Sequence, residues 1–268
     1  TNNITGVGFQ ADLAFFKNRG TANSWIVVDS SRGGTGSGTK SLNLDKTNAE
    51  QTGAYTTWNG FTSDGFNLSG GGTGTINQSS ANMYGMLWRA NGGTTTSDSS
   101  GDITVTRQSN TAGGFAILTY TGNGSADQTI AHGLGKTPAW IVTKNRSSSS
   151  HWAVWHHQYT GYYGQLESTI AWASDSSQFY TDGMTSNFIG VKGSGATNEN
   201  GDNMLAYVWS EIEGYSKFGK YEGNANANGI FVYTGFRPRM LFVKDVDRSE
   251  NWQTFDTERN TFNPVDKG

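Results

Sequence analysis

The sequence predicts an all-β protein built from tandem β-sandwich units, of the jelly-roll or concanavalin-like kind, with long loops rich in Gly, Ser, Thr and Asn. Three observations lead to this prediction. Short apolar, β-branched and aromatic runs recur along the chain, clusters of small polar residues separate them, and blocks of similar sequence return at fixed offsets. Many short strands with turn-rich spacers are typical of sandwiches and barrels.

The composition is that of a folded chain. Of 268 residues, 37 are Gly and 3 are Pro, while 13% are aromatic and 15% are charged. The aromatic content excludes a disordered chain, and the length is sufficient for one large all-β domain or two ordinary domains. Because charged residues are few, the polarity of the chain comes mainly from Ser, Thr, Asn and Gly.

Charge and cysteine content exclude several classes of protein. A formal net charge of −3 gives no basic footprint for nucleic acid, and no apolar run is long enough to cross a membrane. The chain has no Cys, which excludes disulfides and a Cys-ligated zinc site. Thr1 begins neither a basic nor an apolar leader, so we expect a processed start or a cut inside a longer chain.

Three segments of the chain match one another. They are residues 8–17, 135–144 and 235–244, at offsets of 127 and 100 residues. The same two offsets align three further sets of residues: Trp25, Trp152 and Trp252; Asp29, His156 and Asp256; and Arg32, Tyr159 and Arg259. A register that holds over this length indicates internal repetition.

A second block extends the repetition. Two further pairs of segments match: 82–88 with 203–209, and 114–123 with 214–224. These matches divide the chain into three parts: repeat 1 over 1–112, repeat 2 over 113–213 and a partial repeat 3 over 214–268. Half a repeat alone would expose apolar surface and open strand edges. We therefore expect repeat 3 to pack against repeat 2 or to pair with a neighbouring subunit of a homo-oligomer.

The apolar runs predict the strands. Residues 13–16, 140–142 and 240–243 are continuous apolar runs after a turn signal, as in strands buried on both faces. Further β-branched and aromatic runs predict strands at 25–28, 152–155, 103–106, 115–120 and 229–233. The spacers at 33–38, 70–74, 92–101 and 193–201 are predicted to be exposed loops. Only residues 42–51 have a weakly helical pattern.

Aromatic residues give the one candidate binding site. The Trp residues that recur between repeats are expected in the core: Trp25, Trp88, Trp152, Trp209 and Trp252. Exposed rings stack on the apolar face of sugars, so residues in an aromatic-rich part of repeat 2 are candidate glycan-binding residues: Trp155, Tyr162, Tyr163 and Trp172. The alternative is a larger local core in repeat 2.

Polar residues give no catalytic or metal site. The histidines all lie in repeat 2 and lack the further ligands that zinc needs: His132, His151, His156 and His157. A catalytic set of His156, Tyr159 and an Arg is disfavoured, because Asp29 and Asp256 replace His156 in the other repeats. We expect this position to hold a hydrogen-bonding residue at the surface or a strand edge. The prediction is no enzyme activity, no metal and no cofactor.

Two further polar motifs have structural interpretations. Asp29 with Arg32, and Asp256 with Arg259, are predicted to form salt bridges that fix the loop after a strand. Residues 198–203 resemble a calcium loop in composition only, because the ligand spacing is absent, and an ordinary turn is predicted.

The repeated pattern resembles a known family. Four segments carry the resemblance: 8–19, 25–33, 63–66 and 83–88. They are similar to a tandem-repeat domain of unknown function in virion proteins of tailed bacteriophages, chiefly marine and cyanobacterial phages. The join of 119–124 to 132–138 and the segment 214–219 are also characteristic of that domain.

The resemblance implies a non-enzymatic structural protein of the virion. Tail fibre, appendage and capsid-surface proteins that take part in host attachment are the types implied, with other virion proteins as partners and a trimer as the preferred oligomer. The first alternative is a lectin-like module that binds a host surface glycan or receptor, and the second is a polysaccharide-degrading enzyme.

Overall fold

The computed structural model describes residues 2–70 and 76–259, and within them the chain is all-β. The regular elements of this part are twenty strands, β1 to β20, and two single 3₁₀ turns, η1 (Gly36–Gly38) and η2 (Thr181–Gly183). None of its helices has the length and apolar character needed to span a membrane. The predicted fold class is confirmed at this level.

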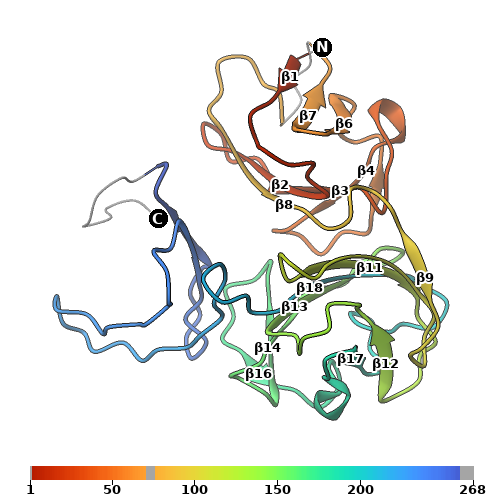
Figure 1. Cartoon of the computed structure of the whole chain (residues 1–268), viewed down its shortest axis with the longest axis vertical. Helices are drawn as coiled ribbons and strands as arrows, with labels where there is room; N and C mark the ends of the chain where they lie inside the picture. The colour runs from red at the N-terminus through yellow and green to blue at the C-terminus, as the bar shows by residue number, and fades with distance from the viewer. Residues whose placement is uncertain (1, 71–75, 260–268) are drawn as a thin grey trace.

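Repeat 1 supplies two sheets (Figure 1). The first sheet has the strand order β5 (Gln51–Thr52), β4 (Lys40–Asn43), β3 (Ile26–Asp29), β2 (Leu13–Asn18) and β8 (Met83–Trp88). A smaller sheet has the order β1 (Asn2–Ile4), β7 (Gly65–Leu68) and β6 (Trp58–Thr62). Neighbouring strands are antiparallel throughout both sheets.

The second sheet is the largest in the structure. Its order is β16 (Ala173–Ser174), β15 (Tyr162–Gln165), β14 (Ala153–His156), β13 (Trp140–Asn145), β18 (Asn203–Trp209), β11 (Phe115–Thr121), β10 (Val105–Asn110) and β9 (Thr96–Asp98). Two separate pairs complete the fold: β12 (Gln128–Ala131) with β17 (Phe188–Val191), and β19 (Met240–Val243) with β20 (Gln253–Asp256). Both β9 and β10 precede residue 112, yet they join the sheet of repeat 2.

The strand pairing reproduces the sequence repeat. Three hairpins have the same register, since Leu13 pairs with Asp29, Trp140 with His156 and Met240 with Asp256. The next strand also matches, since Leu13 pairs with Trp88 and Trp140 with Trp209. The aligned residues Trp25, Trp152 and Trp252 each precede the second strand of their hairpin by one position. The sequence offsets therefore correspond to equivalent places in the sheets.

Both faces of the first sheet are buried. On one face, Ala14 and Phe16 of β2 pack with residues of the smaller sheet in outer cluster 1, which is completed by Ile26, Val28, Trp58, Phe66, Leu68 and Ile76. On the other face, Leu13 and Phe15 pack against the second sheet. Successive side chains of a strand point to opposite faces, so the continuous apolar run of β2 is explained, as predicted.

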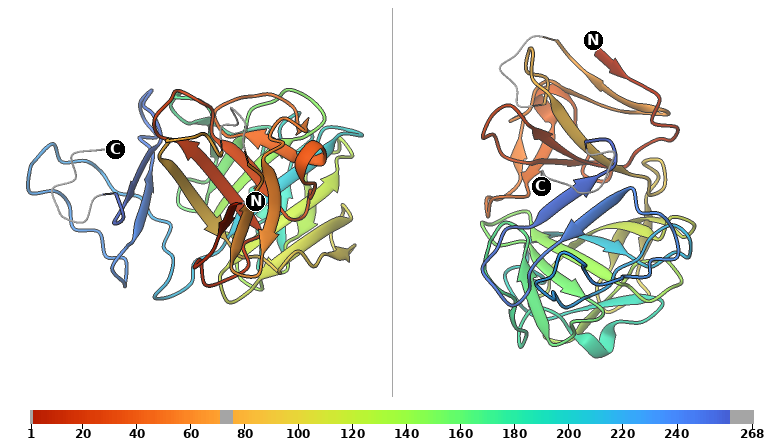
Figure 2. Two further views of the ribbon diagram at one scale, coloured as in Figure 1. Left: turned by 90° about the horizontal axis from the view of Figure 1, so that it is seen from above. Right: turned by 90° about the vertical axis from the view of Figure 1, so that its left-hand side faces the viewer.

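The second sheet is also buried on both faces. One face forms outer cluster 2 with β12 and β17, through Leu118, Ile130 and Val191 among others. The opposite face forms the shared cluster with the first sheet and the β19–β20 hairpin, through Phe115, Trp152 and Tyr207 among others. Figure 2 shows the first sheet, the second sheet and the hairpin around this common centre. Of the five Trp residues predicted to be in the core, Trp152 and Trp209 are buried members of the shared cluster. Trp25, Trp88 and Trp252 are half-buried and pack against it.

Strand β19 differs from its predicted environment. Residues 240–243 were expected to be buried on both faces, but Met240 is 39% exposed and Leu241 is 48% exposed. The reason is that, among residues 2–70 and 76–259, β19 pairs with β20 alone, whereas the equivalent β13 lies between β14 and β18. One side of the hairpin does pack, since Phe242, Val246 and Trp252 contact the shared cluster.

Several predictions about individual segments are wrong. The spacer 92–101 contains strand β9, and residues 229–233 form no strand. The weakly helical pattern at 42–51 covers the end of β4, a loop and the first residue of β5. The spacer 193–201 is partly buried, because the Thr197 carbonyl accepts a hydrogen bond from the Tyr120 hydroxyl and the Asn198 side chain binds the 123–125 loop. Spacer 70–74 lies outside the described residues apart from Gly70.

Removing the Trp209 ring should destabilise the fold. Trp209 is 5% exposed and packs against Trp88, Phe115 and Trp140. A Trp209→Ala variant should lose about 3–5 kcal/mol of unfolding free energy, as large-to-small core substitutions do. Urea denaturation measures the loss, and Phe231→Ala is the control because Phe231 is 85% exposed. Equal stabilities of the two variants would contradict the placement of Trp209.

Candidate functional site

Repeats 1 and 2 meet at a buried group of charged residues. Arg32 Nε lies 2.6 Å from Asp29 Oδ2, and both side chains are fully buried. Arg32 Nη1 lies 3.1 Å from Glu50 Oε2, and Arg146 of repeat 2 binds the same carboxylate through two nitrogens at 2.9 Å. The Tyr207 hydroxyl of repeat 2 donates to Asp29 Oδ2 at 2.6 Å. The predicted Asp29–Arg32 pair forms, but Asp29 is in the interior and not at the surface.

The buried contacts shift the pKa values of three of these residues. Burial opposes ionisation of Arg32, but Asp29, Tyr207 and Glu50 outweigh it and hold the pKa of Arg32 above its usual value. Burial opposes ionisation of Glu50 too, yet Arg146 and Arg32 lower the pKa of its carboxyl. Burial raises the pKa of Tyr207 well above its usual value. These directions keep Arg32 and Glu50 charged and Tyr207 neutral at pH 7, so the ion pair between repeats 1 and 2 persists there.

The contact between repeats 1 and 2 recurs between repeats 2 and 3. The Trp152 indole N–H donates to the Asn43 carbonyl at 2.9 Å, and the Trp252 indole N–H donates to the Gln165 carbonyl at 3.1 Å. The two donors are equivalent at the offset of 100 residues. The two acceptors, Asn43 and Gln165, are the last residues of the equivalent strands β4 and β15 and lie 122 residues apart in the sequence. Equivalent atoms therefore join successive repeats.

Two more hydrogen bonds follow the same rule. Lys144 Nζ donates to the Thr47 carbonyl at 2.9 Å, and Lys244 Nζ donates to the Thr169 carbonyl at 3.3 Å. The backbone bonds at this contact are Glu50 N–H to the Arg146 carbonyl at 2.9 Å and Trp172 N–H to the Val246 carbonyl at 2.8 Å. Each loop of residues 44–50 and 166–172 thus contacts the end of the first hairpin strand of the next repeat and the residues just after it.

Repeat 3 in turn contacts repeat 1. The guanidinium of Arg259 lies 4.7 Å from the centre of the Tyr84 ring of β8. Burial and the carboxylate of Asp256 raise the pKa of Tyr84 to about 12. Arg259 and Asp256 are the equivalents of Arg32 and Asp29, which contact Tyr207 of β18. The Asp-x-x-Arg motif of one repeat thus faces a Tyr of another repeat in both places, and the three repeats contact one another in a cycle.

The candidate glycan-binding residues do not form one exposed surface. Trp155 is 2% exposed within outer cluster 2, and Trp172 is 9% exposed against the shared cluster, so they lie on opposite faces of the sheet. Tyr163 is half-buried beside His151. Tyr162 is 40% exposed. The buried rings of Trp155 and Trp172 offer no face to a sugar, whereas Tyr162 does.

Tyr159 and Trp172 occupy the places of the buried charges in repeat 1. Trp172 is equivalent to Glu50 at the offset of 122 residues, and Tyr159 is equivalent to Arg32. The Arg32–Glu50 ion pair of the first contact is therefore replaced in the second by Tyr159 and Trp172, whose ring centres are 5.7 Å apart in an edge-to-face arrangement at 68°. The aromatic-rich part of repeat 2 thus serves contact with repeat 3. Tyr162 stacks on the outside of Tyr159, with 4.6 Å between the ring centres.

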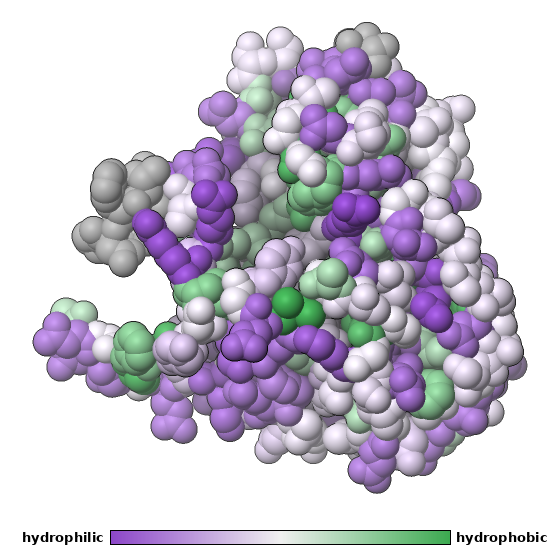
Figure 3. Space-filling model, in the orientation of Figure 1, coloured by the Kyte–Doolittle hydropathy of each residue, from purple (hydrophilic) through white to green (hydrophobic). Residues whose placement is uncertain are grey.

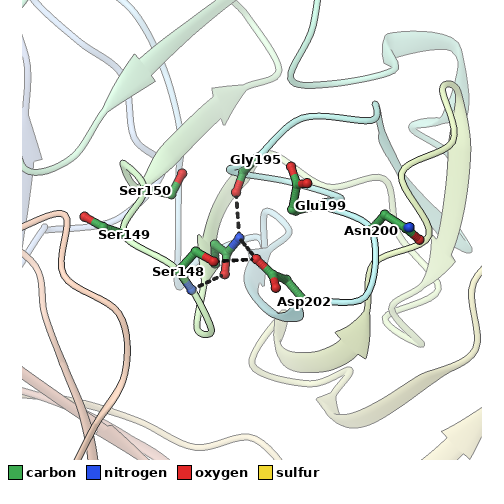
Figure 4. A pocket seen from close by; sticks show the side chains of 8 residues that line it. Ser148, Ser149, Ser150, Gly195, Glu199, Asn200 and Asp202 are labelled. Atoms are coloured by element: carbon green, nitrogen blue, oxygen red, sulfur yellow. Dashed lines mark hydrogen bonds between the residues drawn. The ribbon is translucent and has the colours of Figure 1, made fainter.

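A polar pocket of about 340 Å³ lies beside the 146–150 loop (Figure 4). Its lining residues are Asn145, Ser148, Ser149, Ser150, Gly195, Glu199, Asn200 and Asp202. Asn145 Nδ2 and Ser148 Oγ each donate to Asp202 Oδ2 at 2.8 Å. Across 2–70 and 76–259, no three His, Asp or Glu side chains come together as metal ligands would. Of the two carboxylates that line the pocket, Glu199 and Asp202, the second is already bound by Asn145 and Ser148.

The whole sequence, residues 1–268, matches a family described as Domain of unknown function (DUF7483). The chain belongs to the DUF7483 family. Comparison with curated proteins and with solved structures gave no match.

The partners of the Asp29–Arg32 pair in this DUF7483 chain are not among the residues predicted from the sequence. These partners are Glu50, Arg146 and Tyr207. Glu50 binds Arg32, Tyr207 binds Asp29, and Arg146 binds Glu50. A signal was present in the sequence. Residues 44–50 match 166–172 at an offset of 122 residues, with Leu, an acidic residue, Thr and Ala at equivalent positions. That match is in the segment that was assigned a weak helix.

Breaking the buried ion pair should destabilise the DUF7483 fold more than breaking its equivalent. An Arg32→Met variant leaves the Asp29 carboxylate buried without its cation, which should cost about 3–5 kcal/mol of unfolding free energy. Arg259→Met is the matched control, since the Arg259 and Asp256 side chains keep 19% and 8% exposure. Urea denaturation should give a smaller loss for the control. Equal losses of unfolding free energy in the two variants would show that burial of the Asp29–Arg32 pair does not change its contribution to stability.

Two histidines should make the DUF7483 fold sensitive to acid. Burial lowers the pKa of His132 and of His156 to about 4, from 6.5. The unfolded chain therefore binds protons that the folded chain does not, and the free energy of unfolding should fall as the pH falls from 6.5 to 4. Urea denaturation at several pH values measures this fall.

A His132→Asn variant isolates one of these groups. His132 is buried, and its Nδ1 accepts a hydrogen bond from the Leu134 N–H. The variant removes the titrating ring, so its stability should fall less steeply between pH 6.5 and 4 than that of the parent. Identical pH profiles would show that His132 has an ordinary pKa in the folded chain.

Proposed function

We propose that this chain is a non-enzymatic structural protein of a bacteriophage virion, of the tail fibre, appendage or capsid-surface type, with a part in host attachment. The observation that carries the proposal is the repeated contact between repeats. Three pairs of hydrogen bonds join equivalent atoms in successive repeats. A chain whose repeats bind one another through the same atoms is suited to building an extended or projecting structure, and other virion proteins are its proposed partners.

The proposal includes tandem β-sandwich units of jelly-roll or concanavalin-like type. Its support is that a smaller sheet or strand pair covers the outer face of each large sheet, through outer clusters 1 and 2. Since β9 and β10 join the second sheet, we place the boundary between the first two units at residues 89–95 instead of 112. Repeat 3 contributes only its hairpin to this arrangement within the described residues.

The best candidates for acid–base catalysis are poorly matched to it. Burial, with a smaller contribution from His157, lowers the pKa of His156 to about 4. Burial and the neighbouring Asp247 raise the pKa of Tyr159 above its usual value. A general acid or base works best when its pKa is near the working pH. These environments support a structural role over a polysaccharide-degrading one.

A lectin-like module is the second candidate. The stacked pair of Tyr159 and Tyr162 favours it, because the Tyr162 ring is exposed and a second ring holds it in place. A ring fixed in this way has little freedom to lose when a sugar stacks on it. The area is small, however, because Trp155 and Trp172 are buried.

Immunogold electron microscopy tests the virion proposal. Antibodies raised against the purified chain should label intact particles of a phage that encodes it, at a fixed place on the tail or the capsid surface. Particles of an unrelated phage serve as the control for the antibody. Absence of the chain from purified virions, checked by mass spectrometry of their proteins, would overturn the proposal.

Glycan arrays test the lectin-like alternative. If that alternative holds, the purified chain binds a defined set of oligosaccharides and Tyr162→Ala abolishes the binding, because the exposed ring is lost. Tyr163→Phe is the control, since it keeps the half-buried neighbouring ring. Binding that survives Tyr162→Ala would remove Tyr162 from the site, and no binding at all would exclude a lectin-like role for the glycans on the array.

A further inference from the structure

The polar pocket beside the 146–150 loop belongs entirely to repeat 2. Its lining residues lie at the end of β13, in the loop after it, and in the loop that precedes β18. The volume of about 340 Å³ is in the range of small-molecule sites, roughly 300–1,000 Å³. On the face shown in Figure 3, repeats 1 and 2 present mostly hydrophilic and neutral residues. A ligand that binds to such a surface has to be recognised through hydrogen bonds.

Both walls of this pocket are held in place by the protein itself. In the first wall, Asn145 Oδ1 accepts hydrogen bonds from the backbone N–H groups of Ser147 and Ser148, each at 2.9 Å. In the second wall, the side chain of Asn198 is buried and its Nδ2 donates to the Ser125 carbonyl at 2.8 Å. A site with walls fixed in this way loses little conformational freedom when a ligand binds.

The equivalent side chains of repeat 1 are bound to each other. Asn18 and Asn145 are the last residues of the equivalent strands β2 and β13. Asn18 Nδ2 donates to Gln78 Oε1 at 2.9 Å, so the Gln78 side chain is held against the end of β2. In repeat 2, Asn145 Nδ2 donates to Asp202 Oδ2 instead, at 2.8 Å.

This exchange of partners leaves carboxylate oxygens free in repeat 2. Glu199 is the equivalent of Gln78 at the offset of 121 residues that relates 82–88 to 203–209. Gln78 is half-buried, whereas Glu199 is exposed and lines the pocket. Within residues 2–70 and 76–259, no protein group donates to the Glu199 carboxylate, and both donors to Asp202 bind its Oδ2, which leaves Oδ1 free.

We propose that this pocket binds one sugar residue, whose hydroxyl groups donate hydrogen bonds to Glu199 and Asp202. Hydrogen bonds to a carboxylate are stronger than those between neutral groups. The Ser150 hydroxyl also lines the pocket and can donate to a sugar oxygen or accept from a hydroxyl. No Lys or Arg of the described chain lines the pocket, so a sugar that carries a carboxylate, a sulfate or a phosphate has no cation to bind there. The ligand is therefore a neutral sugar or an amino sugar.

The pocket is separate from the Tyr162 site of the lectin-like alternative. Ser150 precedes β14, whereas Tyr162 is the first residue of the antiparallel strand β15 and so lies toward the other end of β14. A Tyr162→Ala variant should therefore keep the sugar binding of the pocket. The inference is also independent of the virion proposal, since a chain that is absent from virions could still bind the sugar.

Titration of the isotopically labelled chain, followed by NMR, tests the pocket. The probes are the methyl glycosides of glucose, galactose, mannose and glucosamine, and methyl glucuronide is the anionic control. A ligand of this size should bind with a dissociation constant on the order of 1 mM. It should shift the amide signals of residues 148–150 and 199–202, whereas the glucuronide should shift none of them.

Two variants separate the pocket from the rest of the fold. Glu199→Ala removes the free carboxylate and should weaken sugar binding about 10-fold, as the loss of a hydrogen bond to a charged group does. Gly195→Phe should abolish binding by filling the pocket, and a Cβ at Gly195 would have only Glu199 Oε2 near it, at 3.6 Å. Glu213→Ala is the matched control, since Glu213 is also exposed but does not line the pocket. All three variants should melt near the temperature of the parent.

Three results would overturn the proposal. The first is the absence of shifts with every neutral sugar and amino sugar tested. The second is sugar binding that survives both Glu199→Ala and Gly195→Phe. The third comes from calcium chloride as a competing probe: shifts at residues 199–202 with calcium, and none with any sugar, would assign the free carboxylates to a cation.

Discussion

The shared cluster is the constraint on which the rest of the structure depends. It lies between the two large sheets and takes residues from all three repeats, so each large sheet must be apolar on the face toward it. The outer faces are also covered, through outer clusters 1 and 2. Strands β2 and β13 therefore carry continuous apolar runs, with little alternation of apolar and polar residues. A slip of one residue in the register of such a strand would move the side chains of each packed face to the opposite face of the sheet.

Polar contacts around this cluster fix how the repeats lie against one another. Apolar packing is not directional, whereas the indole bonds of Trp152 and Trp252 each select one carbonyl on the preceding repeat. The side chains beside these bonds differ greatly, from a buried ion pair at Arg32 to an aromatic pair at Tyr159. The backbone geometry is thus kept while the chemistry around it varies.

Part of this architecture could be predicted from the sequence. Offsets between Trp25, Trp152 and Trp252 gave equivalent hairpins, because register is encoded by the same local residues in each repeat. The burial of Asp29 and the separation of Trp155 from Trp172 could not be predicted. They depend on which sheet face lies toward another repeat, and that is decided by residues distant in the sequence: Tyr207 lies 178 positions from Asp29, and Trp252 lies 87 positions from Gln165. The loop at 44–50 was misassigned for the same reason, since its partners lie in repeat 2.

The direction of the contact between repeats has an evolutionary consequence. Repeats 2 and 3 each give side-chain donors and one backbone carbonyl to the repeat before them. Repeats 1 and 2 each give the matching carbonyls and one backbone N–H, from the β4-type strand and the loop after it, to the repeat that follows. A duplicated gene segment would therefore encode a repeat that carries both sides of this contact. Arrays of different length could arise by unequal recombination without redesign of any contact, while each copy remained free to diverge in the side chains around the retained hydrogen bonds.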